Sequence, residues 1–172
     1  MSDQGEISLR NRAPSPDTTT LLNVTTTERI PAVEGWFTTS EPYTLIGAKC
    51  TACGTVVFPP RSGSCPSPDC DGTELEPTPL SRKGKVWSYT ENHYAPPPPY
   101  VAAEPFEPYA LAAVELEAEG IVILGQVAKG VMAADLSIGQ EVEVDLQVLY
   151  RNDEGVDHWI WTWAPSAPKG AK

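Results

Sequence analysis

Beyond residue 84 the chain alternates apolar and polar side chains with a period of two, the pattern of half-buried strands. The clearest stretch is QEVEVDLQVLY (140–150), which predicts one buried face and one solvated face. The side expected to be buried holds Val142, Val144, Leu146 and Val148, and the solvated side holds Glu141, Glu143, Asp145 and Gln147. The same alternation predicts four further strands, over 85–94, 109–117, 120–128 and 157–163.

Short connections between these strands indicate antiparallel neighbours. Glu119-Gly120 separates the second strand from the third, and Asn152 to Gly155 separates the fourth from the fifth. The segment 129–139 has room for a single helical turn, which an OB barrel carries at this position. Five antiparallel strands without a long helix favour a small closed or nearly closed OB-fold barrel, and a small sandwich is the alternative.

The first part of the chain lacks this alternation. Residues 1–30 are rich in Ser, Thr, Pro and Asp, so we expect a mobile N-terminal arm. Pro31 suits a first helical position, and Val33, Trp36 and Phe37 have a spacing that covers one helical face. We therefore expect a short helical lead-in over residues 31–46.

All four cysteines lie within CTACGTVVFPPRSGSCPSPDC (50–70), in two close pairs that are each followed within two residues by glycine. Tight turns of this kind point backbone amides at thiolates, and two of them on adjacent hairpins form a zinc ribbon. Two disulfides are disfavoured where thiols stay reduced, and the close spacing argues against four unrelated thiols. We predict one structural zinc ion held by four ligands: Cys50, Cys53, Cys65 and Cys70.

A complete thiolate shell has a chemical consequence, because it leaves no free thiolate to attack a thioester. The two histidines, His93 and His158, lie at strand ends, where a structural role is the ordinary one. No nucleophile elbow, phosphate loop or dinucleotide fingerprint is present. The sequence therefore assigns no catalytic residue.

Net charge limits the class of partner. The 172 residues carry a formal charge of -11, and residues 86–168 contain thirteen Asp and Glu against Lys129 and Arg151 alone. Nucleic-acid binding needs clustered Lys and Arg, so we expect no nucleic-acid partner. The start of the chain lacks the apolar core of a signal peptide, and no apolar run is long enough to span a membrane. We expect a cytoplasmic protein without membrane attachment.

The loop YAPPPPYVAAEPFEPY (94–109) is less ordinary than the other connections. Four consecutive prolines favour an extended segment that loses little entropy on binding, and aromatic residues flank it. A self-packed loop covering the barrel mouth is the equal alternative. The residues that we expect to face a substrate or partner are His93, Tyr94, Tyr100, Phe106 and Tyr109.

Several motifs together resemble a known family. They are CTACG (50–54), FPPR (58–61), the second cysteine pair and SRKGKVWSYT (81–90). In this order they resemble the zinc-ribbon plus OB-fold proteins that accompany thiolase-like enzymes in bacteria and archaea, over about residues 31–165. The second cysteine pair is spaced more widely than the common two-residue gap.

The resemblance implies a mainly β accessory protein, with a short N-terminal helical segment, a rubredoxin-like zinc ribbon and a five-stranded OB-fold barrel. Its partner would be a thiolase-fold or lipid-transfer-protein-like subunit, in a heterotetramer. Such partners carry out retro-aldol or Claisen cleavage, or acyl transfer, on CoA thioesters, including those of steroid side chains. An acyl-CoA would then be the ligand of the complex, and this chain would be noncatalytic.

Domain boundaries follow from these readings: an arm over 1–30, the lead-in over 31–46, a zinc ribbon over 47–80, a barrel over 81–168 and a tail over 169–172. Two other functions stay open at this point. One is a stand-alone OB-fold module for a small acyl ligand or single-stranded nucleic acid. The other is a zinc-dependent enzyme in its own right, which would need an exchangeable fourth ligand.

Overall fold

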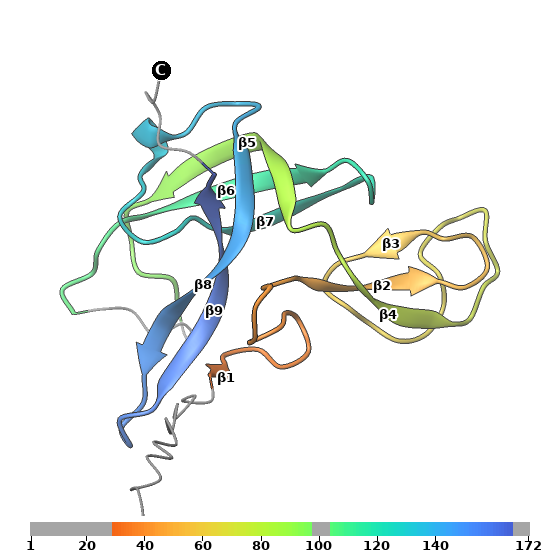
Figure 1. The fold of residues 1–172 in the computed structure, drawn as a ribbon, viewed down its shortest axis with the longest axis horizontal. Coiled ribbons are helices and arrows are strands. Elements are labelled where there is room, and N and C mark those ends of the chain that lie inside the picture. Colours follow the sequence, from red (N-terminus) through yellow and green to blue (C-terminus); the bar gives the residue numbers. More distant parts are fainter. Residues whose placement is uncertain (1–28, 98–103, 167–172) are drawn as a thin grey trace, which may run out of the picture.

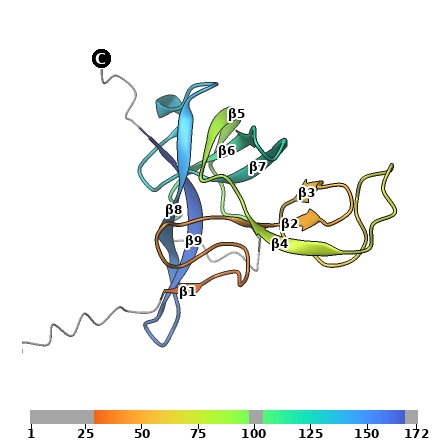
Figure 2. The same cartoon turned by 45° about the vertical axis from the view of Figure 1, so that its right-hand side comes forward.

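The computed structural model describes residues 29–97 and 104–166 as a mainly β protein with two sheets (Figure 1). The smaller sheet has the strand order β3-β2-β4, and the larger has the order β1-β9-β8-β5-β6-β7. Figure 2 shows the smaller sheet projecting from one side of the larger one. The strands are β1 (Ile30–Pro31), β2 (Ile46–Cys50), β3 (Val56–Val57), β4 (Leu75–Pro79), β5 (Lys83–Asn92), β6 (Tyr109–Leu116), β7 (Ile121–Gln126), β8 (Glu141–Arg151) and β9 (Asp157–Pro165).

All five strands predicted from the alternation form in the larger sheet, as β5 to β9. The inward positions of β6 are fully buried, among them Val114 and Leu116, while the residues between them stay partly exposed. On β8, Val142, Val144 and Leu146 are buried as predicted, but Val148, expected on the same face, is 41% exposed beside a shift in the β8–β9 register. The period of two thus gives the core face of β6 and most of β8, because successive side chains leave a strand on opposite sides, whereas Thr162 of β9 is buried on the side opposite Trp161 and Trp163.

The larger sheet curls into an OB-like half-barrel around one core. β5 pairs antiparallel with both β6 and β8, so it bridges the two sides of the curl. The two sides meet again at Val127 and Trp163, which form an isolated parallel bridge. The N–H of Ala128 donates to the carbonyl of Trp163 at 3.0 Å. A single curled sheet thus replaces the two facing sheets that a sandwich requires.

Aromatic side chains connect the smaller sheet to the core of the half-barrel. Phe58, from the FPPR motif, packs edge-to-face on Trp161 with ring centroids 5.8 Å apart, and on Trp36 at 5.6 Å. Trp161 in turn packs edge-to-face on the buried Trp163 at 5.5 Å. Gly125 of β7 leaves the space that the Trp161 ring fills. The two sheets therefore share a continuous aromatic contact.

The expected helical lead-in over 31–46 is wrong. Ile30 and Pro31 form β1, parallel to β9, and the N–H of Ala32 donates to the carbonyl of Trp159 at 2.7 Å. The chain then turns, and Phe37 and Leu45 form an antiparallel bridge with both side chains buried. Both side chains belong to the same buried cluster as the core of the half-barrel. Long-range packing thus overrides the local helical spacing.

The single helical turn expected between the third and fourth strands is a 3₁₀ turn, η1 (Ala133–Asp135). Apart from residues 29 and 30, the N-terminal arm expected over 1–30 lies outside the described residues, as does the tail over 169–172. Across residues 29–97 and 104–166, no helix is long and apolar enough to cross a membrane.

Candidate metal centre

Two turns at the far end of the smaller sheet bring the cysteines together. Cys50 ends β2, its carbonyl accepts the N–H of Gly54 at 2.9 Å, and its own N–H donates to the carbonyl of Thr55 at 2.9 Å. Gly54 has φ = +80°, a backbone conformation that favours glycine. In the second turn the N–H of Cys65 donates to the carbonyl of Gly72 at 2.8 Å. The glycines after each pair therefore allow the chain to reverse around the sulfurs.

The sulfur atoms converge with the spacing of a metal site. The four Sγ atoms of Cys50, Cys53, Cys65 and Cys70 all lie within 4.8 Å of one another. The Cys50–Cys70 distance is 3.9 Å and the Cys53–Cys65 distance is 3.5 Å. A tetrahedral zinc with Zn–S bonds of about 2.3 Å separates its sulfurs by about 3.8 Å. All four are free thiols, and the donor set fits one tetrahedral zinc ion.

Backbone donors surround the sulfurs closely. The N–H of Ser67 donates to Cys65 Sγ at 3.5 Å, and the N–H of Gly72 donates to Cys70 Sγ at 3.4 Å. A Cβ on Gly72 would lie 2.9 Å from Cys50 Sγ and 3.2 Å from Cys70 Sγ. Such amides favour the charged thiolate, and Gly72 leaves them room to approach.

The thiols differ in acidity. Hydrogen bonds from the Thr55 hydroxyl, 3.1 Å away, and from its backbone N–H lower the pKa of Cys53 to about 6. The Gly72 N–H lowers the pKa of Cys70, but hydrogen bonding to Cys53, burial and the other thiols outweigh it and raise that pKa to about 12. Four adjacent thiolates need a cation, and a divalent metal supplies that charge.

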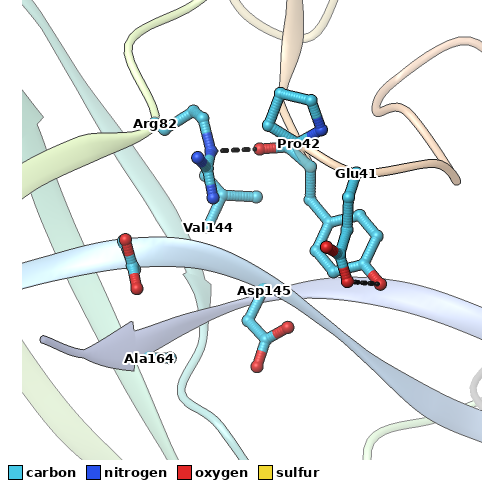
Figure 3. Close-up of a pocket in the computed structure, with 8 residues that line it drawn as sticks. Glu41, Pro42, Arg82, Val144, Asp145 and Ala164 are labelled. Atoms are coloured by element: carbon cyan, nitrogen blue, oxygen red, sulfur yellow. Dashed lines mark hydrogen bonds between the residues drawn. The ribbon is translucent and has the colours of Figure 1, made fainter.

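Hydrogen bonds at Ser81 and Arg82 hold the connection from the smaller sheet to the half-barrel. Arg82 Nε donates to the carbonyl of Tyr43 at 2.9 Å, and the N–H of Ser81 donates to Glu119 Oε1 at 2.7 Å. Figure 3 shows Arg82 and Glu41 on the sides of a pocket that Asp145 of β8 also lines. The pocket measures about 480 Å³. The hydrogen bond between Arg82 and Tyr43, both in the pocket lining, joins the segment before β2 to the start of β5.

The residues predicted to face a substrate or partner fall into two groups. His93 and Tyr94 are exposed after β5, and His93 Nε2 lies 3.0 Å from Glu91 Oε1. Phe106 and Tyr109 pack edge-to-face with ring centroids 6.2 Å apart. Tyr100 lies outside the described residues. The structure thus brings Phe106 and Tyr109 together, and the pocket that they line does not include His93 or Tyr94.

That second pocket measures about 280 Å³, and its lining is mixed: apolar side chains stand beside Glu107, Lys129, Gln126 and Gln147. Val127, Met132 and Val148 line its far side, and the Gln147 side chain accepts the N–H of Lys129 at 2.8 Å. The sequence analysis did not predict that these residues line a pocket. No local signal could have found it, because these residues alternate like ordinary strand and turn positions and meet Phe106 only in the folded chain.

Fold and metal centre together define a class of protein: a rubredoxin-like zinc ribbon followed by an OB-fold domain. Two family models match the chain, the ChsH2 rubredoxin-like zinc ribbon domain over residues 41–76 and the ChsH2 C-terminal OB-fold domain over residues 77–147. The chain belongs to the ChsH2/DUF35 family, which confirms the resemblance read from the motifs.

Relatives and a solved structure agree with this assignment. The chain is 39% identical over 138 residues to a DUF35 domain-containing scaffold protein of Methanocaldococcus jannaschii, a match that covers 77% of this chain and 89% of the relative. It is 34% identical over 117 residues to the benzoylsuccinyl-CoA thiolase subunit BbsA of Thauera aromatica, covering 67% and 71%. A chain of the solved Ltp2-ChsH2(DUF35) aldolase superposes with a TM-score of 0.54 at 26% identity, covering 72% of this chain and 86% of that one.

Proposed function

We propose that this chain is a scaffold subunit of a complex that cleaves or transfers the acyl group of a CoA thioester, and that a partner subunit carries the catalytic residues. Two similar proteins belong to such assemblies by name, a thiolase subunit and an aldolase, and a third is named as a scaffold protein. The observation that carries the proposal is the four-cysteine cluster. Because one metal site uses every thiol, the chain keeps no thiolate nucleophile.

We propose that the cluster holds one structural zinc ion. When bound, zinc supplies the positive charge that four thiolates share, and it links the two turns of the ribbon. The folded ribbon then presents Phe58 to Trp36 and Trp161. The metal would thus stabilise the contact between the ribbon and the half-barrel, without an open position for a substrate.

We propose that the pocket beside Phe106 and Tyr109 forms this chain's share of the acyl channel, and that His93, Tyr94 and Tyr100 also face the substrate or the partner. The apolar part of the pocket lining, which includes Phe106, Met132 and Val148, supports an acyl ligand. The acidic half-barrel repels phosphates, so the nucleotide end of CoA would lie on the partner. The partner class is a thiolase-fold, lipid-transfer-protein-like subunit in a cytoplasmic heterotetramer, acting on a steroid or other lipid side-chain thioester.

Co-expression tests the proposal. The chain is produced together with a thiolase-fold protein of the same organism, and the complex is isolated through a tag on one subunit. We expect co-purification at a fixed ratio and thioester cleavage by the complex, with no turnover by the chain alone. Cleavage by the purified chain alone, or failure of the two proteins to associate, would overturn the proposal.

The apolar part of the pocket lining also favours a second candidate, a stand-alone module for a small acyl ligand. Titration of the isolated chain with a short-chain acyl-CoA separates the two functions. Saturable binding without any partner supports the stand-alone module, whereas binding only by the complex supports the scaffold subunit. An oligonucleotide serves as the control, and the excess of carboxylates predicts that it does not bind.

A further inference from the structure

The outward side of β5, β6 and β7 carries an apolar patch. The strand register places Ala113 between Ser88 and Leu124, and a bulge beside Ser88 turns Trp87 outward as well. One row further along, Val122 lies in register with Glu115. Exposed fractions are 63% for Trp87, 64% for Leu124 and 49% for Val122. We call this surface the β5–β7 face, defined by Trp87, Ala113, Val122 and Leu124.

These outward residues are not part of the core of the half-barrel. The inward positions of the same strands, Val86, Val114 and Ile123, are nearly fully buried and already form it. The outward positions at the start of β8 are acidic instead: Glu141, Glu143 and Asp145. A contiguous exposed apolar patch on an otherwise charged surface is typical of a protein interface.

The edge of the sheet adds to the exposure of this face. β7 is the last strand of the larger sheet, and within the described residues its ladder is with β6. Val127, the residue after β7, forms an isolated bridge with Trp163. The outer edge of β7 therefore presents backbone groups beside Val122 and Leu124. Exposed apolar edge strands promote aggregation unless another surface covers them.

Charge indicates what covers the face. Four described Lys and Arg residues, on β5, β8 and the β7–β8 connection, are each paired with a carboxylate of this chain, and the 172 residues keep a formal charge of -11. The pairs are Lys83–Glu141, Lys85–Glu117, Lys129–Glu107 and Arg151–Asp157. A second copy would bring the same negative surplus against this one. A partner with Lys and Arg around an apolar centre complements the face instead.

We propose that the β5–β7 face is the surface on which the thiolase-fold subunit docks, through an apolar area of that subunit ringed by Lys and Arg. This inference rests on the scaffold function proposed above. The docked subunit would cover Trp87 and Leu124 and protect the free edge of β7. Salt should slow the association, because the attraction between an acidic and a basic surface is screened at high ionic strength.

Charge substitution on the face tests the inference. Leu124→Glu adds a carboxylate on the β7 side of the face, and Trp87→Ala removes its largest apolar side chain. Ile30→Glu is the matched control, since Ile30 is a 40% exposed aliphatic residue on β1, at the opposite edge of the sheet. Each variant is co-expressed with the tagged thiolase-fold protein, and circular dichroism melts confirm that it folds.

We expect Leu124→Glu and Trp87→Ala each to weaken association by about tenfold or more, and Ile30→Glu to leave it unchanged. If the wild type binds and both face variants bind equally well, the docking face is wrong and the scaffold function stands. If the wild type does not bind, the scaffold function fails and the docking face with it. A dimer of the isolated chain that Leu124→Glu converts to a monomer in sedimentation would assign the face to a second copy and overturn the proposal.

Discussion

Adding a methyl group at Gly72 should weaken zinc binding without removing a ligand. The Cβ of Gly72→Ala would lie 2.9 Å from Cys50 Sγ, 3.1 Å from Ala52 Cβ and 3.2 Å from Cys70 Sγ. Gly72 does not have a positive φ, so alanine at this position introduces no left-handed backbone strain. The variant therefore tests the packing around the sulfurs, separately from their number.

The size of the effect follows from these contacts. Carbon and sulfur atoms at 2.9 Å repel each other, so either the second turn shifts or the two sulfurs move by a few tenths of an ångström. The same shift disturbs the hydrogen bond from the Gly72 N–H to Cys70 Sγ. Changes to groups that support metal ligands typically cost about 10- to 100-fold in metal affinity, or about 1.4–2.7 kcal/mol.

A competition assay measures the change. The apo and zinc-loaded chains are titrated against a chromogenic chelator at constant pH, and metal content is measured by elemental analysis. Thr73→Ala is the control, because this exposed neighbour changes side-chain size without adding an atom beside the sulfurs. We expect one zinc per chain in all three proteins, with weaker affinity in Gly72→Ala alone. Equal affinities for the wild type and Gly72→Ala would show that the close packing around Cys50 and Cys70 is not needed to hold zinc.

Three further predictions address the metal, the core and the ion pairs. Removing the metal with a strong chelator should open the segment 50–75 to proteases while the half-barrel stays protected, because the ribbon holds few buried side chains besides Cys50. Mass spectrometry of the fragments locates the cuts. Uniform cleavage along the chain would contradict this prediction. Gly125→Ala should lower the free energy of unfolding by about 1–3 kcal/mol in urea, since its Cβ would overlap the buried Trp161 ring; an unchanged midpoint would contradict this. The hydrogen bond from Arg151 lowers the pKa of Asp157. The pair therefore stabilises the fold at pH values above the unfolded carboxyl pKa of about 4. This contribution is lost as the pH falls through the lower pKa of the folded state. Asp157→Asn should therefore unfold with a weaker pH dependence below about pH 4, and a profile identical to that of the wild type would rule out the pair.

The local sequence was enough to predict the strands and the metal ligands. In β8 alternation predicted both the strand and most of its core face, because side chains leave a strand on alternate sides whatever lies opposite. The four cysteine ligands could also be predicted from the local sequence. Its four ligands come from two tight turns, and the glycines that those turns require follow within two residues of Cys53 and Cys70. Both signals act over a few neighbouring residues.

Other features depended on partners far away in the sequence. Residues 31–46 have helical spacing, yet β1 pairs with β9, and Phe37 pairs with Leu45 against the core. Phe58 meets Trp161 across more than a hundred residues, and Phe106 shares a pocket with Val148. The exposure of Leu124 also follows from how far the sheet curls. Such contacts arise only when distant segments are brought together, because burial and pairing are properties of the packed chain and a short window of sequence does not contain the partner.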